Sequence, residues 1–378
     1  MAKIFNVNGA CRPSWHYMVD LTSRLNEIKA MIDVGKYFAI NRARQYGKTT
    51  VLHALADYLK HDYEVISLDF QVMGALSFQD EPTFVAAFSQ ELLDASPNIP
   101  EKIEKKLTDF VEGTATINSL QALFKVIKLW CKQSGKPLVL IVDEVDTAAN
   151  NQVFLDFLAQ LRAYYLKRPD TNTFQSVILS GVYDIRSIRR KLRPDEEHKQ
   201  NSPWNISADF DVAMSFSPED IAGMLNQYEA DYHTGMDITK LSRLLFEYTS
   251  GYPVLVSRLC NLMDEKIPRM DNFKDKAAAW SKDGLLEAVK LLLSEKNALF
   301  DSLIGKLEDY PELKNLIRML LFQGQTILYN ADSPAINMLL MFGFAKVEQM
   351  CVQIANRIFE VRLYNYFLTL PVVQENKI

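Results

Sequence analysis

The run Leu138-Val139-Leu140-Ile141-Val142 is the most hydrophobic stretch of this 378-residue chain, and two carboxylates, Asp143 and Glu144, follow it directly. A strand that is apolar at every position must be covered on both faces, which is typical of parallel sheets with helices on either side. The adjacent acidic residues need a polar site, so they mark the end of the strand. This single feature favours an α/β fold with an acidic edge to its sheet.

Similar short apolar runs recur along the first half of the chain, and segments with helical spacing separate them. Besides 138–142, the predicted strands are 37–40, 65–70 and 176–180, and the predicted helical segments are 48–60, most of 81–132, and 151–166. Alternation of strands and helices predicts βαβ units and a parallel sheet. We also expect one additional strand at Val212–Phe216.

The second half of the chain is predicted to be mainly helical. Ser217 followed by Pro218 and two acidic residues is a helix start, with serine as the N-cap. Helical spacing continues to about residue 293, and the last ~75 residues then give helix, helix, β-hairpin and helix. Those elements are predicted at 313–322, 333–342, 345–348 with 351–354, and 358–368. We therefore predict three domains: an α/β core over 1–216, a helical lid over 217–300, and a winged-helix-like domain over 301–378.

Composition excludes several classes of protein. The formal net charge of −5, from 42 basic and 47 acidic residues, gives no general attraction to nucleic acid. The four cysteines are far apart and form no metal-binding spacing, so we expect free thiols. No apolar run approaches the ~20 residues of a membrane span, and the first residues lack the apolar core of a signal peptide. These features predict a cytoplasmic protein with no membrane contact.

The segment Arg42–Thr50 carries the main chemical signal. A phosphate-binding loop has the pattern G-x-x-x-x-G-K-[ST] between a strand and a helix, and Gly47, Lys48 and Thr49 match it. Arg42 replaces the first glycine. Phosphate binding depends on backbone N–H groups, the helix N-terminus and the lysine charge, all of which remain. The segment therefore predicts a phosphate site despite this substitution.

Each residue of the loop has an expected role. Lys48 would neutralise the β- and γ-phosphates, and Thr49 would hold Mg²⁺. Thr50 and the backbone of Gln45, Tyr46 and Gly47 would contact the other phosphates. Arg44, and alternatively Arg42, would add positive charge near the γ-phosphate.

The acidic strand end supplies the remaining candidates. Asp143 would hold Mg²⁺ through its water shell, because Mg²⁺ uses one or two carboxylates together with phosphates. Glu144 would orient and deprotonate the attacking water. Ser180, at the end of the next apolar strand, would sense the γ-phosphate or the water; alternatively it is a plain strand-ending serine.

Three segments together resemble a known family: Ile40–Thr50 (INRARQYGKTT), Val139–Asp146 (VLIVDEVD) and Thr249–Pro253 (TSGYP). They resemble the bacterial AAA-like P-loop ATPases, which belong with the archaeal-type and STAND ATPases. The resemblance implies that Pro253 lies near the nucleotide at the start of a lid helix. It also implies that the N-terminal segment covers the adenine, with Tyr17 as a candidate, together with His16 and Asp20; for Tyr17, core packing is the alternative.

The arginines at 186, 189 and 190 are candidates for an arginine finger, or alternatively a solvated basic segment. The leading interpretation is a Mg²⁺-dependent ATPase whose turnover drives or gates domain movement and partner interaction. Two alternatives stay open: a nucleotide-gated switch with little turnover, and an ATP-regulated DNA-binding protein. We expect protein partners at the C-terminal domain, with DNA as the less favoured partner, and the sequence leaves oligomer formation open.

Overall fold

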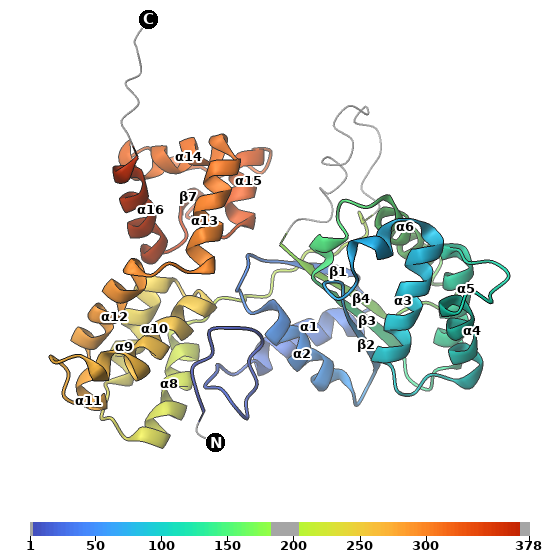
Figure 1. Cartoon of the computed structure of the whole chain (residues 1–378), viewed down its shortest axis with the longest axis horizontal. Coiled ribbons are helices and arrows are strands. Elements are labelled where there is room, and N and C mark those ends of the chain that lie inside the picture. The colour runs from blue at the N-terminus through green and yellow to red at the C-terminus, as the bar shows by residue number, and fades with distance from the viewer. Residues whose placement is uncertain (1–2, 183–203, 371–378) are drawn as a thin grey trace, which may run out of the picture. The chain divides into compact units, whose positions relative to one another are not determined.

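The computed structural model of this chain describes residues 3–182 and 204–370 (Figure 1). These residues group into two compact units. The sheet unit comprises residues 21–42 and 51–212, and the helical unit comprises residues 1–20, 43–50 and 213–378.

The sheet unit is built on four strands in the order β1-β4-β3-β2. The strands are β1 Phe38–Asn41, β2 Glu64–Asp69, β3 Leu138–Asp143 and β4 Ser176–Gly181. All neighbouring strands pair in parallel. Every residue of β3 and β4 is buried, as the all-apolar runs require. The prediction of an α/β fold with a parallel sheet is therefore confirmed.

Helices cover both faces of this sheet (Figure 1). Their bounds are α1 Thr22–Asp33, α2 Lys48–Leu59, α3 Glu81–Ala95, α4 Glu101–Val111, α5 Leu120–Gln133 and α6 Gln152–Leu166, with short 3₁₀ turns η1 Ala75–Phe78 and η2 Val145–Thr147. One hydrophobic core joins α3 to α6 with alternate strand residues such as Leu68, Leu140 and Leu179. Side chains alternate along a strand. The intervening residues Asp69, Asp143 and Ser180 therefore belong to the opposite face, on the side of α1 and α2.

The strand expected at Val212–Phe216 is wrong, because these residues are not in a strand. Only a single parallel bridge, Phe38 to Ala208, adds to the β1 edge. The backbone groups that a strand would have used are engaged elsewhere: the carbonyl of Val212 accepts from Arg42, within the sheet unit. In the helical unit, the Phe216 N–H donates to the carbonyl of Gly251.

The helical unit contains a bundle after residue 217 and a small mixed domain after residue 297. The bundle consists of α8 Pro218–Tyr232, α9 Ile238–Thr249, α10 Pro253–Glu265, η4 Ile267–Arg269, α11 Lys276–Ala279 and α12 Lys282–Ser294. Ser217 caps α8 as predicted: its side chain accepts from the Asp220 N–H while the Asp220 carboxylate accepts from the Ser217 N–H.

The C-terminal part contains α13 Ala298–Asp309, α14 Pro311–Phe322, β5 Ile327–Leu328, α15 Pro334–Met341, β6 Ala345–Glu348, β7 Cys351–Ile354 and α16 Arg357–Thr369. The β-hairpin lies at the predicted residues, and its strands join β5 in an antiparallel sheet of order β5-β7-β6. A single helix, α15, separates β5 from β6. The winged-helix assignment and the three domain boundaries stay predictions.

The described helices include none that is both long and apolar enough to cross a membrane.

Candidate functional site

The phosphate-loop sequence joins β1 to α2, as the motif requires. Two of its residues have left-handed backbone conformations, Gln45 with φ 58° and Gly47 with φ 80°. The Lys48 side chain is buried, and its Nζ donates to the carbonyl of Ala43 at 3.2 Å. The loop therefore curls around its own lysine, which holds that charge beside the backbone N–H groups at the start of α2.

Tyr252, from the Gly-Tyr-Pro segment, anchors this loop within the helical unit. Its hydroxyl donates to the carbonyl of Arg44 at 2.7 Å. Its ring meets the ring of Tyr46 edge-on, with centroids 4.6 Å apart. Tyr46 in turn shares a hydrogen bond of 3.1 Å with Ser215. The loop conformation is thus set by two side chains outside the motif, Tyr252 and Ser215, and the sequence pattern did not reveal the role of Tyr252.

The segment before α10 requires a glycine at position 251. The φ of Gly251 is 71°, and a Cβ placed there would lie 1.9 Å from the carbonyl oxygen of Phe216. The two backbones also bond directly, with the Phe216 N–H donating to the Gly251 carbonyl at 2.8 Å. Pro253 follows as the first residue of α10 and is buried. Backbone conformation and close approach together fix this motif.

The C-terminal part of the helical unit also reaches the phosphate loop. A Cβ on Gly343 would lie 2.7 Å from the Ala43 side chain and 3.5 Å from the ring of Tyr252. On the other side, the Phe359 ring lies 5.4 Å from the Tyr252 ring, edge to face. Tyr252 therefore contacts the phosphate loop and α16 at the same time.

The N-terminal segment lies beside the start of α2. The Cys11 N–H donates to the Thr50 hydroxyl at 3.0 Å. The Arg12 guanidinium lies 5.6 Å from the ring centroid of Trp15, which is 59% exposed. Neither Arg12 nor Trp15 was predicted as a site residue, although an exposed tryptophan beside an arginine offers an aromatic face and a positive charge.

Tyr17, predicted at the adenine, is a core residue instead. It is 1% exposed, and its hydroxyl donates to Asp231 at 2.7 Å. Its ring packs against Phe5 and Tyr228 at 4.9 and 5.3 Å. Burial, followed by the Asp231 hydrogen bond, raises the pKa of Tyr17 well above its ordinary value. This geometry supports the core-packing alternative, because no ring face is left for a base.

Asp143 and Glu144 lie at the carboxyl edge of the sheet, where open α/β sheets bind ligands. Asp143 is 7% exposed, and its Oδ1 accepts the Glu144 N–H at 2.9 Å. Glu144 has φ 51°, a left-handed conformation that costs of order 1–3 kcal/mol in a residue with a side chain. Such strain clusters at functional sites, so the turn after β3 is a candidate for one.

Asp146 ties this turn to the end of β4. Its Oδ2 accepts the Val182 N–H at 2.6 Å, and a Cβ on Gly181 would lie 2.8 Å from its Oδ1. Asp146 is the last acid of the D-E-V-D string, but its role depends on a close backbone approach from β4. No local pattern could have shown that approach.

Two buried polar atoms at the same sheet edge have no hydrogen-bond partner among the described residues, Ser180 Oγ and Asn41 Oδ1. Ser180 is fully buried. Because Val142 pairs with Leu179, Asp143 and Ser180 come next on their strands and share one face. Unsatisfied buried groups are rare and call for an explanation. A ligand at this edge would provide one.

Arg42, which replaces the first glycine of the motif, bonds to backbone carbonyls of the sheet unit. Its guanidinium donates to the carbonyls of Asn41, Phe210 and Val212 at 3.0 to 3.4 Å. It also lies 5.4 Å from the ring centroid of Phe210. These contacts hold residues 210–212 beside β1. Because they engage the Arg42 guanidinium, the exposed Arg44 is the better candidate for a positive charge that contacts a phosphate. The arginines at 186, 189 and 190 lie outside the described residues.

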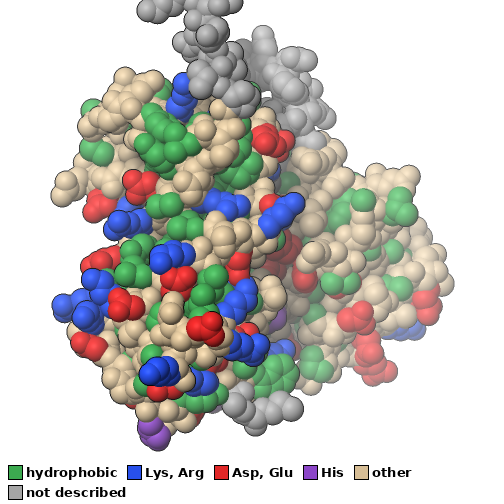
Figure 2. All heavy atoms as spheres, turned by 60° about the vertical axis from the view of Figure 1, so that its left-hand side comes forward, with side chains coloured by type: hydrophobic (Ala, Val, Ile, Leu, Met, Phe, Trp, Pro, Cys, Tyr) green, Lys and Arg blue, Asp and Glu red, His purple; other side chains and the backbone are tan. Residues whose placement is uncertain are grey.

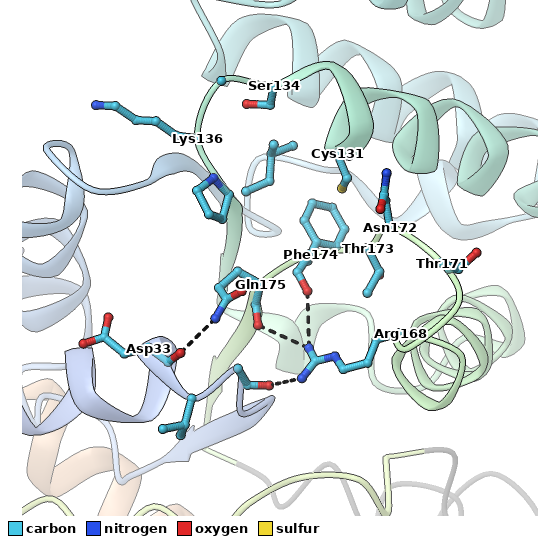
Figure 3. Close-up of a pocket in the computed structure, with 15 residues that line it drawn as sticks. Asp33, Cys131, Ser134, Lys136, Arg168, Thr171, Asn172, Thr173, Phe174 and Gln175 are labelled. Carbon is cyan, nitrogen blue, oxygen red and sulfur yellow. Dashed lines mark hydrogen bonds between the residues drawn. The ribbon is translucent and has the colours of Figure 1, made fainter.

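A cavity of about 610 Å³ lies at the opposite, amino edge of the sheet, between residues 33–35, 131–138 and 168–175 (Figure 3). Its central cation, Arg168, donates to the carbonyls of Gly35, Phe174 and Gln175. Arg168 also stacks on Tyr165, 4.3 Å from the ring centroid. The guanidinium therefore joins the loop after α6 to the loop between α1 and β1. The acidic residue of the rim, Asp33, bonds to Lys29. This cavity carries none of the predicted site residues.

The residues present fit a Mg²⁺ ion. The described residues include no group of three or more His, Cys, Asp or Glu side chains that could hold a metal. Mg²⁺ does not need such a group, because it combines one or two carboxylates with phosphate and water. A buried carboxylate, Asp143, beside the unsatisfied hydroxyl of Ser180 provides the protein side of such a site.

The fold and the motif define a P-loop nucleotide-binding class of protein. The family described as AAA-like domain matches residues 14–360, so this chain belongs to the AAA-like P-loop ATPase family. The sequence-based resemblance is confirmed. Membership of this family indicates nucleotide binding.

A solved ATPase structure shares the fold. The Walker-type ATPase of Pyrococcus abyssi is similar over 95% of this chain and 99% of its own length, with a TM-score of 0.59 and 13% identity. Cdc6p of Pyrobaculum aerophilum is similar over 96% and 98%, with a TM-score of 0.45 and 11% identity. Among curated sequences, the portal protein of Pseudomonas phage phiKMV is 24% identical over 209 residues. That match covers 51% of this chain and 39% of the portal protein.

Proposed function

We propose that this protein binds ATP with Mg²⁺ and hydrolyses it. The observation that carries the proposal is the order of elements at one sheet edge. There β1 leads directly into the G-K-T loop, β3 ends with Asp143, and β4 has Ser180 as its next-to-last residue. Parallel strands present their carboxyl ends together, which is where α/β proteins bind nucleotides. Family membership supports the same assignment.

The phosphate loop would hold the triphosphate. Backbone N–H groups from Gln45 to Thr49 would donate to an anion at the start of α2, and the helix N-terminus adds a partial positive charge. Lys48 would neutralise the β- and γ-phosphates, with Arg44 beside them. Thr50 already bonds to the N-terminal segment through the Cys11 N–H, so that contact would hold the segment near the nucleotide.

Thr49 and Asp143 would hold Mg²⁺, which supplies charge neutralisation at the β- and γ-phosphate oxygens. Glu144 would accept a proton from the water whose oxygen attacks the γ-phosphorus, while the bond to the ADP oxygen breaks. Ser180 would hydrogen-bond to the water or to a γ-phosphate oxygen. Its buried hydroxyl, with no partner among the described residues, supports that role.

For contact with the adenine base, the exposed residues Trp15 and Arg12 are better candidates than Tyr17. Aromatic faces stack on nucleobases, with contributions of about 1–3 kcal/mol per base. The Cys11–Thr50 hydrogen bond places their segment beside the phosphate loop within the helical unit. Pro253 stays a proposed neighbour of the nucleotide through its place one residue after Tyr252.

A direct test combines turnover with binding. Phosphate release by the purified chain should require Mg²⁺ and should fall at least ~100-fold in Glu144→Gln, because general-base catalysis contributes that much. Lys48→Ala should weaken ATP binding at least ~10-fold in calorimetry. Glu265→Gln and Lys240→Ala, at exposed positions, are the matched controls. Equal phosphate release by wild type and Glu144→Gln would refute the hydrolysis part of the proposal.

A second candidate function is a switch that binds ATP with little turnover. The contacts of Tyr252 favour it, because one side chain links the phosphate loop to α16 and would pass nucleotide state to the C-terminal part. Tight Mg²⁺-ATP binding together with negligible wild-type phosphate release would select this candidate.

The C-terminal part is proposed to contact protein partners. Leu328, Val347 and Met350 are exposed apolar residues on or beside its small sheet. Lys346 pairs with Glu348, so the β6 strand does not present an uncompensated basic row. Figure 2 likewise shows basic and acidic side chains interspersed on the face drawn. DNA binding, which requires clustered positive charge, is the weaker alternative.

A further inference from the structure

Asp69 and Asp143 are the last residues of the neighbouring strands β2 and β3, and they lie directly opposite each other in the parallel register. Paired residues on adjacent strands point to the same face, at a strand spacing of about 4.8 Å. Two like charges in this arrangement repel each other. Asp69 has no local sequence signal that marks it as a site residue, because only the pairing of β2 with β3 brings it to the site.

The described part of the chain provides Asp69 with no ion pair. Its Oδ1 accepts the N–H of Gln71 at 2.8 Å, which holds the carboxylate at the strand end. The side chain is exposed, so an ion from solvent can reach it. Strand pairing and a backbone hydrogen bond therefore hold the two carboxylates side by side. Among the described residues, no lysine or arginine forms an ion pair with Asp69.

Ser180 provides an independent sign of a ligand at this place. It occupies the other neighbouring strand, β4, on the same face as Asp143. Its hydroxyl is fully buried and has no partner among the described residues. Asp69, Asp143 and Ser180 thus form a row of three oxygen-bearing side chains across β2, β3 and β4.

We propose that this row is a divalent-cation site that binds Mg²⁺ or Mn²⁺ in the absence of nucleotide. Asp143 holds the hydrated ion at the centre of the row, and Asp69 and Ser180 contact the waters of the ion from either side. Mg²⁺ keeps several waters when it binds protein, so partners about 4.8 Å away are within reach of its hydration shell. This inference deepens the proposed ATP site and assigns a second carboxylate to it.

The consequence is that the protein would load its metal before ATP arrives. A preloaded cation lowers the repulsion between the triphosphate and the acidic sheet edge. Asp69 acts here as a positioning residue that holds the hydrated ion over Asp143, whereas Glu144 keeps its role with the attacking water.

Mn²⁺ binding to the full chain without nucleotide tests the proposal, measured by electron paramagnetic resonance and by calorimetry. We expect one site whose affinity falls ~10-fold in Asp69→Asn, because outer-shell partners contribute 10- to 100-fold to metal affinity. Asp143→Asn should abolish binding. Asp69→Glu, which keeps a carboxylate, should bind Mn²⁺ more tightly than Asp69→Asn does. The control Asp170→Asn, at an exposed position, should have wild-type affinity.

A second measurement covers the risk that a variant misfolds. Without metal, Asp69→Asn should melt at or above the wild-type temperature, because one repelling charge is gone. Mn²⁺ should raise the wild-type melting temperature more than that of Asp69→Asn, because an ion that binds only the folded state stabilises it. Equal Mn²⁺ affinity in wild type and Asp69→Asn would overturn the proposal.

The outcomes separate this inference from the proposed function. Mn²⁺ binding that depends on Asp69, in a protein that shows no ATP binding, would keep the cation site and remove the ATP site. ATP hydrolysis with Mn²⁺ binding that is indifferent to Asp69 would keep the ATPase and remove the role of Asp69.

Discussion

The hydroxyl of Tyr252 donates a hydrogen bond to the backbone carbonyl of Arg44, 2.7 Å away, so the residue before the α10 proline holds the phosphate loop. A backbone carbonyl cannot be changed by substitution at Arg44 itself. The conformation of the loop is therefore controlled from Tyr252, whose side chain is almost fully buried.

Tyr252→Phe should weaken Mg²⁺-ATP binding ~3- to 10-fold while the protein stays folded. It removes one hydrogen bond with a net value of about 0.5–1.5 kcal/mol and keeps the ring contacts with Tyr46 and Phe359. Calorimetry with Mg²⁺-ATP measures the effect, and Tyr310→Phe serves as a control. Unchanged affinity in Tyr252→Phe would show that the loop keeps its conformation without this bond.

Gly251→Ala should destabilise the helical unit by several kcal/mol. The substitution forces a side chain into a left-handed backbone conformation and places it 1.9 Å from the Phe216 carbonyl oxygen. Gly223, in the middle of α8, is the matched control because an added Cβ there meets no atom within 4 Å. Gly223→Ala should be neutral or stabilise by about 0.5–1 kcal/mol. Thermal unfolding of both variants gives the comparison.

The sequence predicted those parts of the fold that depend on local patterns. The apolar run 138–142 and the cap at Ser217 need only their own neighbours, and both lie where they were expected. The strand at Val212–Phe216 was wrong because Arg42, far away in the chain, takes a carbonyl that strand pairing would have needed. The short strand β5 was missed because two residues carry no periodicity.

The candidate site divides in the same way. The phosphate-loop residues and the Asp143-Glu144 pair are contiguous strings whose chemistry can be recognised directly. Asp69 depends on strand register, and Tyr252 on the packing of the helical unit, so neither could be found by spacing. Tyr17 shows the converse: its residue type suited a base contact, but Phe5, Tyr228 and Asp231 enclose it in the core.

Asp146→Ala should reduce ATP turnover more than it reduces ATP affinity. The change leaves the Val182 N–H without its carboxylate partner and frees the end of β4, which carries Ser180. A hydrogen bond to a charged group contributes about 1.5–3 kcal/mol, so we also expect a lower melting temperature. Steady-state kinetics with separate kcat and KM values test this, with Asp156→Ala on α6 as control. A loss confined to KM would place the effect on nucleotide binding instead.

The ion pair of Arg258 with Glu295 predicts how stability responds to acid. Burial opposes ionisation of Glu295, but hydrogen bonds from Arg258 and Lys266 outweigh it and hold the pKa of Glu295 below its ordinary value. A carboxylate whose pKa is lower in the folded state stabilises the fold above its unfolded pKa, and that stability is lost as pH falls through the folded pKa. The contribution should therefore be complete at neutral pH and decline below the ordinary glutamate value of 4.5.

Glu295→Gln should lower the free energy of unfolding by about 1.5 kcal/mol at pH 7 and reduce its slope between pH 5 and 3. Urea unfolding at several pH values measures both quantities, and Glu287→Gln, beside Lys290 on α12, is the control. Parallel pH profiles for wild type and Glu295→Gln would mean that this carboxylate does not contribute to the acid response, and the pairing with Arg258 would then have no net stabilising value.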